Sequence, residues 1–162
     1  MKYSAEEVFN IGVEIEKNGF AFYTAAAAKT KDDEGKRLLL ELAAWEKNHV
    51  TIFENLKIDM PANLKSGEDL FDLDGEVHKY FKAAADSHIF KKGADINKIL
   101  EGLDSLLDVF RMALHFEKDS VVLYQGMKQM VTENLGKKHI DKIIEEEMKH
   151  VANMQERIEQ LA

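Results

Sequence analysis

The chain has 162 residues, enough for one domain with a sizeable core, and its 45% hydrophobic and 32% charged residues are typical of a soluble globular protein. It contains no cysteine, which excludes disulfides, iron–sulfur clusters and thiolate metal sites within it. Its net charge of −8 disfavours nucleic-acid binding, for which a basic surface is expected.

The first helix is predicted to begin at Ser4, which has the spacing of a capping box with Glu7. Its inward stripe advances in steps of three and four through Phe9, Gly12, Glu16, Phe20, Tyr23 and Ala27. The pattern fades in the polar stretch 29–33, where an aspartate can cap the next helix.

The second helix is predicted to end near Asp59, because Pro61 disfavours helix at the residue before it. Its stripe consists of Leu39, Leu42, Glu46, His49, Phe53 and Leu56. A connection rich in Gly, Ser and Asp follows over residues 58–75, and a shorter helix is predicted over 76–90, closed by the sequence Lys-Lys-Gly at 91–93.

A third long helix is predicted from Asp95 to the region 132–136, and a fourth from there to the end of the chain. Their stripes are Leu103, Leu106, Phe110, Ala113, Glu117, Val121 and Tyr124, and then Ile140, Ile143, Glu147, His150, Met154, Ile158 and Leu161. Two short loops and one long connection predict a single all-α domain over 1–162. It is a four-helix bundle of two antiparallel hairpins, joined by a crossover over 58–95 that contains a short extra helix.

Glutamate, tyrosine and histidine residues on these stripes repeat at one offset. The first-half set is Glu16, Tyr23, Glu46 and His49, and the second-half set is Glu117, Tyr124, Glu147 and His150. Each member of the second set follows its counterpart by 101 residues (117−16 and 150−49 agree). A lone Glu-x-x-His is usually a solvated pair. The four glutamates and two histidines, however, all share one offset, which indicates a duplicated helical hairpin whose residues act together.

The four glutamates lie within apolar stripes, where each buried carboxylate costs several kcal/mol unless it is paired or binds metal. No lysine or arginine lies on the same stripes to pair with them. Two divalent cations would balance four carboxylates, with the two imidazoles as neutral donors. One glutamate from each of two helices and a Glu-x-x-His from each of the other two therefore predict a di-metal carboxylate site.

The pattern resembles the ferritin-like superfamily, and most closely a rubrerythrin-type di-iron domain that lacks the rubredoxin segment. The resemblance covers residues of about 5–57 and 96–160. It implies that Glu16 and His49 hold one metal ion, that Glu117 and His150 hold the other, and that Glu46 and Glu147 bridge the two. Tyr23 and Tyr124 match family tyrosines that hydrogen-bond ligand carboxylates, with ordinary core packing as the alternative.

Two departures from the family pattern bear on activity. The chain has no cysteine-rich segment to deliver electrons. Rubrerythrins also carry an extra glutamate one turn from the ligand on the third helix, associated with redox-dependent iron movement, but the positions one turn either side of Glu117 are Leu114 and Ser120.

The other histidines, His78, His88, His115 and His139, have no counterpart at the repeat offset and are expected to be solvated or packed, with a supporting role beside the ligands as the alternative for His115. Trp45 is expected to pack between helices.

The resemblance implies a non-haem di-iron oxidoreductase that reduces peroxide or dioxygen with electrons from an external rubredoxin-like donor or flavoprotein. The ligand types suit iron, with manganese and zinc as alternatives. The alternative functions are an iron-binding, sequestering or sensing protein without turnover, and a scaffold stabilised by its metal.

No signal-peptide or membrane-spanning stretch is recognised, so a cytoplasmic protein without nucleic-acid or membrane partners is expected. Formation of a homodimer through the crossover is an alternative role for that segment.

Overall fold

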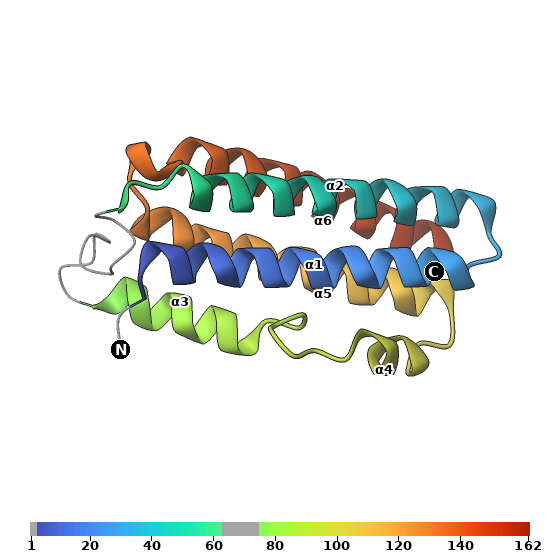
Figure 1. The fold of residues 1–162 in the computed structure, drawn as a ribbon. Helices are drawn as coiled ribbons and strands as arrows, with labels where there is room; N and C mark the ends of the chain where they lie inside the picture. Colours follow the sequence, from blue (N-terminus) through green and yellow to red (C-terminus); the bar gives the residue numbers. More distant parts are fainter. Residues whose placement is uncertain (1–2, 63–74) are drawn as a thin grey trace.

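The computed structural model describes residues 3–62 and 75–162, and every regular element in these ranges is a helix (Figure 1). The four long helices are α1 (Ala5–Lys29), α2 (Asp33–Ile58), α5 (Leu106–Met130) and α6 (Lys137–Leu161). Helices α1 and α2 pack as one hairpin, and α5 and α6 pack as the other. The predicted all-α bundle of two antiparallel hairpins is confirmed.

The ends of the first hairpin follow from local side-chain chemistry. The predicted capping box is present, because the Glu7 N–H donates to Ser4 Oγ at 3.1 Å and the Ser4 N–H donates to Glu7 Oε2 at 2.7 Å. Asp32 caps α2 by accepting from the Gly35 N–H at 2.6 Å. These contacts fix where each helix begins and so fix the register of the residues that point inward.

The crossover contains α3 (Glu76–Ser87) and α4 (Ile96–Glu101), which lie along the outside of the bundle beside α5 and α1 (Figure 1). The part of the predicted connection at 63–74 lies outside the described residues. The predicted helix over 76–90 ends three residues early, because His88 adopts an extended conformation and the Ile89 N–H donates to Asp119 Oδ2 at 3.0 Å. The crossover is thereby fastened to α5.

The third long helix predicted from Asp95 is wrong in one respect, because the chain forms two helices there. Asp95 caps only the short α4, accepting from the Lys98 N–H at 3.1 Å. The helix ends at Gly102, and Ser105 caps α5 anew by accepting from the Asp108 N–H at 3.1 Å. A short 3-10 turn, η2 (Glu133–Leu135), then separates α5 from α6.

The core lies between the four long helices and is rich in phenylalanine, including Phe9, Phe22, Phe53, Phe110 and Phe116. Two stripe residues were placed wrongly, since Phe20 and Leu161 are exposed. Gly19 faces the core in place of Phe20, and a Cβ added there would lie 2.5 Å from the Phe116 ring, whereas Leu161 is the last residue of α6. Among residues 3–62 and 75–162, no helix combines the length and apolar character needed to cross a bilayer.

Candidate metal centre

Six of the residues singled out from the sequence meet in the middle of the bundle. Glu16 comes from α1, Glu46 and His49 from α2, Glu117 from α5, and Glu147 and His150 from α6. The four glutamates and His49 are fully buried, and His150 is 6% exposed. Because the chain reaches this point from all four long helices, the site depends on the tertiary fold rather than on any one helix.

These residues form two overlapping groups. The His49 group is Glu16, Glu46, His49 and Glu147, and the His150 group is Glu46, Glu117, Glu147 and His150. Within each group the potential ligand atoms lie within 4.8 Å of one another. Glu46 and Glu147 belong to both groups, which is the placement that ligands shared between two metal ions require.

Both imidazole rings turn the same nitrogen towards the carboxylates. His49 Nδ1 lies 3.3 Å from Glu16 Oε2 and 3.1 Å from Glu147 Oε1. His150 Nδ1 lies 3.1 Å from Glu147 Oε2 and 3.4 Å from Glu117 Oε2. A metal ligand in either ring would therefore be Nδ1, and Nε2 would be left for an outer contact.

Several carboxylate oxygens in the centre have no hydrogen bond from the described residues. They are both oxygens of Glu46, together with Glu117 Oε2 and Glu147 Oε1, which are met only by the ion-pair contacts of His150 Nδ1 and His49 Nδ1 described above. Within the same ranges, no lysine or arginine forms an ion pair with any of these three glutamates. Buried carboxylate oxygens without donors are costly, and a bound cation would satisfy them. The donor set of carboxylates and imidazoles fits two metal ions.

Protons occupy the centre when no metal is bound. Burial raises the pKa of Glu46 well above its ordinary value, and the neighbouring charges of Glu16 and Glu147 raise it further. Burial likewise raises the pKa of Glu117, with the charge of Glu147 adding to it. For Glu147, burial acts in the same direction, but hydrogen bonding to His150 and His49 outweighs it and lowers the pKa.

The two histidines show the opposite balance. Burial alone would lower their pKa values, but Glu16 and Glu147 raise the pKa of His49 to about 12. Glu117 and Glu147 raise the pKa of His150 to about 10. Each imidazole is therefore in its positively charged imidazolium form at neutral pH in the metal-free protein. The proton on Nδ1 must leave before this nitrogen can bind a metal ion.

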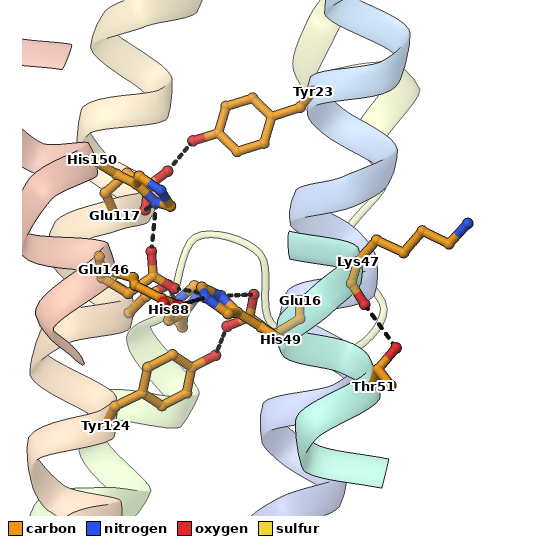
Figure 2. A network of polar contacts seen from close by, with 12 residues as sticks. Glu16, Tyr23, Lys47, His49, Thr51, His88, Glu117, Tyr124, Glu146 and His150 are labelled. Atoms are coloured by element: carbon orange, nitrogen blue, oxygen red, sulfur yellow. Dashed lines mark hydrogen bonds and ion pairs between the residues drawn. The ribbon is translucent and has the colours of Figure 1, made fainter. Parts of the chain in front are cut away.

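The two predicted tyrosines reach across the bundle to the opposite hairpin. The Tyr23 hydroxyl donates to Glu117 Oε1, and the Tyr124 hydroxyl donates to Glu16 Oε1 (Figure 2). Tyr23 corresponds to Tyr124 in the repeat, and Glu16 corresponds to Glu117, so each hydrogen bond is the counterpart of the other. The duplicated halves are therefore related by approximate two-fold symmetry in the site. Burial raises the pKa of both hydroxyls well above 10, which keeps them as donors.

We predict that Tyr23→Phe lowers the stability of the metal-free protein by about 1–3 kcal/mol, because Glu117 Oε1 loses its buried donor. Tyr124→Phe should cost a similar amount, since it makes the equivalent contact with Glu16. Urea unfolding in the presence of a chelator measures both changes. Tyr80→Phe is the control: it removes a half-exposed hydroxyl that donates to Val122 O outside the site, and it should cost less than the loss of a buried donor. Stabilities that match the wild type in both variants would contradict this role.

A family model described as Rubrerythrin matches residues 7–156 of the chain. The chain belongs to the Rubrerythrin family. Among solved structures, a protein of Thermotoga maritima described as a ferritin-like di-iron-carboxylate protein shares the fold, with a TM-score of 0.73 and 23% identity over 99% of this chain and 98% of that one. A search among curated protein sequences found no significant match. Membership of the Rubrerythrin family makes this a di-iron-carboxylate type of protein, and its buried groups suit two metal ions.

Sequence reasoning missed Glu146, which this member of the Rubrerythrin family places against a candidate ligand. Glu146 Oε2 lies 2.9 Å from His49 Nε2, and the glutamate is 8% exposed (Figure 2). The repeat could not reveal it, because the position 101 residues earlier is Trp45. Trp45 was expected to pack between helices, but its side chain is 43% exposed and its ring lies beside that of His150, with centroids 6.0 Å apart. The ring of Trp45 on α2 thus lies against α6, in agreement with the expectation, although much of the residue remains exposed.

The crossover supplies a second feature that the sequence did not reveal. His88 is buried, accepts the Phe90 N–H at Nδ1 (3.1 Å) and contacts Ser120 Oγ through Nε2 (3.2 Å). Burial lowers the pKa of His88 to about 4, so the ring is neutral. Ser120 lies one turn from Glu117, so His88 stands close to the metal centre without belonging to either ligand group.

The remaining histidines lie away from the centre. His115 and His139 are exposed, which removes the alternative that His115 supports a ligand. His78 is buried near the N-terminus, where its ring stacks on Tyr3 with centroids 6.4 Å apart. None of these residues belongs to either of the two ligand groups found in the described residues.

Proposed function

We propose that this chain is a non-haem di-iron oxidoreductase that reduces peroxide or dioxygen with electrons from an external donor. The observation that carries the proposal is that the His49 group and the His150 group share both Glu46 and Glu147. Two ions held by common ligands would act together on one substrate, which is what a two-electron reduction needs. Family membership and the imidazole–carboxylate donor set favour iron as the metal.

The protein's own residues would prepare the site in three ways. Glu46 and Glu147 would hold both ions in place while their charge changes. Tyr23 and Tyr124 would fix the outer carboxylates, Glu117 and Glu16, so that these ligands cannot rotate away. The chemistry that two iron ions supply when bound is one electron each, the pair that cleavage of a peroxide O–O bond takes up.

Buried aromatic side chains surround the site. The Phe116 ring lies beside Tyr23, with centroids 5.9 Å apart, and beside Phe90, with centroids 4.8 Å apart. Phe53 lies beside Tyr124, with centroids 5.4 Å apart. All five rings are fully buried, so they exclude water from the carboxylates and strengthen electrostatic interactions there.

One observation favours a second candidate, an iron-binding protein that sequesters or senses the metal without turnover. The extra glutamate associated with iron movement in rubrerythrins is absent one turn either side of Glu117, where the chain has Leu114 and Ser120, and the Ser120 hydroxyl contacts His88. A site without that glutamate would hold its ions in one arrangement. Metal would then bind tightly, and peroxide would not oxidise it at a useful rate.

Stopped-flow absorbance separates the two candidates. Protein loaded with ferrous iron under anaerobic conditions is mixed with hydrogen peroxide, and in a parallel experiment with dioxygen. For the proposed enzyme we expect rapid reoxidation by at least one of the two oxidants and repeated cycles when a reduced rubredoxin or flavoprotein is supplied. A di-ferrous sample that peroxide and dioxygen leave unchanged over minutes would rule out the oxidoreductase and favour the iron-binding protein.

A further inference from the structure

We propose that the two metal positions are unequal, so that the His49 group binds its ion tightly and the His150 group holds the weaker, exchangeable ion. The proposal rests on the metal-binding part of the proposed function and does not depend on peroxide reduction. It comes from one difference between the duplicated halves. The same pair of positions in the two halves, 45 and 146, carries a tryptophan in one and a glutamate in the other.

The His49 ring is held at both nitrogens. Nδ1 faces Glu16 and Glu147, while Nε2 pairs with Glu146 Oε2 at 2.9 Å. His49 is fully buried and Glu146 is 8% exposed, so this contact is shielded from water. A carboxylate on the outer nitrogen of a ligand histidine fixes the ring's orientation and makes the inner nitrogen a stronger donor. The His49 position is therefore pre-organised before metal arrives.

His150 lacks this support. Its Nδ1 faces Glu117 and Glu147, but no carboxylate of the described residues contacts its Nε2. Trp45 stands at the position that corresponds to Glu146, and an indole N–H can only donate, so it cannot take Glu146's role as an acceptor. The Trp45 ring is tilted 58° to the imidazole and is 43% exposed, and His150 itself is 6% exposed. The His150 position is thus both less fixed and nearer to solvent.

The expected difference in metal affinity between the two positions follows from the effect that such outer hydrogen bonds have on metal binding. Removing the outer hydrogen-bond partner of a ligand typically weakens metal binding by about 10–100-fold. The remaining donors of the two groups correspond under the repeat, with Glu16 matching Glu117 and with Glu46 and Glu147 shared. We therefore expect dissociation constants that differ by about 10–100-fold between the two positions.

Manganese(II) alone is the probe, because it suits the same donors and needs no redox step. Chelator-treated full-length protein is titrated anaerobically by calorimetry, and crystals are grown with one equivalent of manganese per chain. We expect two binding steps and anomalous scattering concentrated at the His49 group. The first ion at the His150 group, or equal occupancy of both positions, would overturn the proposal. If no manganese or iron binds at all, the proposed function itself fails.

Three variants test whether Glu146 is the cause. Glu146→Ala should weaken the tighter step by about 10–100-fold and leave the weaker step unchanged. Glu145→Ala removes the exposed neighbouring carboxylate and should change neither step. Trp45→Glu supplies a carboxylate at the corresponding position and should tighten the weaker step. Unchanged tight binding in a folded Glu146→Ala protein, or an unchanged weaker step in Trp45→Glu, would count against this explanation. The anomalous occupancy of the wild type decides the ranking even if a variant does not fold.

Discussion

Glu46→Met should make the metal-free protein more stable and, at the same time, abolish metal binding at both positions. Neither oxygen of Glu46 has a hydrogen-bond partner among the described residues, although the side chain is fully buried. Methionine keeps the length of glutamate and removes the desolvation penalty. A buried polar group without a hydrogen-bond partner costs about 1–3 kcal/mol, and we expect a gain in that range when the two oxygens are removed.

The metal-loaded protein should respond in the opposite direction. Glu46 belongs to both ligand groups, so its loss removes a donor from each ion. A ligand present at about 1,000 times its dissociation constant stabilises the folded state by about 4 kcal/mol, and this stabilisation should disappear in the variant. The order of stability between wild type and variant would therefore reverse when metal is added.

Chemical unfolding of both proteins, with chelator and with ferrous iron or manganese under anaerobic conditions, measures the reversal. Glu41→Met on the exposed side of the same helix is the matched control and should show no reversal. A metal-free Glu46→Met protein that is less stable than the wild type would show that the carboxylate is satisfied without metal. If the variant still bound two ions, Glu46 would not be a ligand that the two ions share.

The meeting of these six residues could be predicted because their positions obey two short-range rules at once. Glu46 and His49 are three residues apart on one helix face, and the 101-residue offset repeats that spacing at Glu147 and His150. Helical periodicity fixes which residues point inward, and the duplication fixes which inward residues belong together. The four long helices and the six-residue centre follow from these rules, with the cap at Ser4 setting the start of the first helix.

The features that escaped prediction depend on partners distant in sequence. The contact of Glu146 with His49 joins residues 97 apart, and it interrupts the repeat instead of following it. His88 reaches Ser120 only because the crossover is fastened to α5, and the break at Gly102 competes with a helical pattern that continues through it. The exposed position of Phe20 follows from the close approach of Gly19 to Phe116. Periodicity assigns a helix face, but it does not say which neighbour will fill it.

The stability of the metal-free protein should fall as the pH rises from about 7 to about 9. In the folded state the pKa of His49 is raised to about 12 and that of His150 to about 10, whereas in the unfolded chain both titrate near their ordinary value of 6.5. Below that value both states are protonated and the full contribution to stability is present. Above it, the unfolded chain loses the protons that the folded protein keeps.

The other groups with shifted pKa values either do not change the stability between about pH 7 and about pH 9 or change it in the same direction as the histidines. The lowered pKa of Glu147 gives a contribution that is lost only as the pH falls below the ordinary carboxylate range. The contribution of His88, whose pKa is lowered to about 4, is lost as the pH falls below 6.5 and is complete above it. The raised pKa values of Glu46 and Glu117 act in the same direction as those of the histidines.

The expected slope is up to about 1.4 kcal/mol per pH unit for each of the two histidines, and urea unfolding with chelator at a series of pH values measures it. His49→Gln should reduce the slope, whereas His139→Gln, at an exposed position, should leave it unchanged. Metal-loaded protein has already released these protons, so its stability should not fall in the same window and the stabilisation by metal should grow with pH. A metal-free stability that stays level or rises between about pH 7 and about pH 9 would mean that the imidazoles are neutral in the empty centre, and that the unpaired oxygens of Glu46 are balanced in some other way.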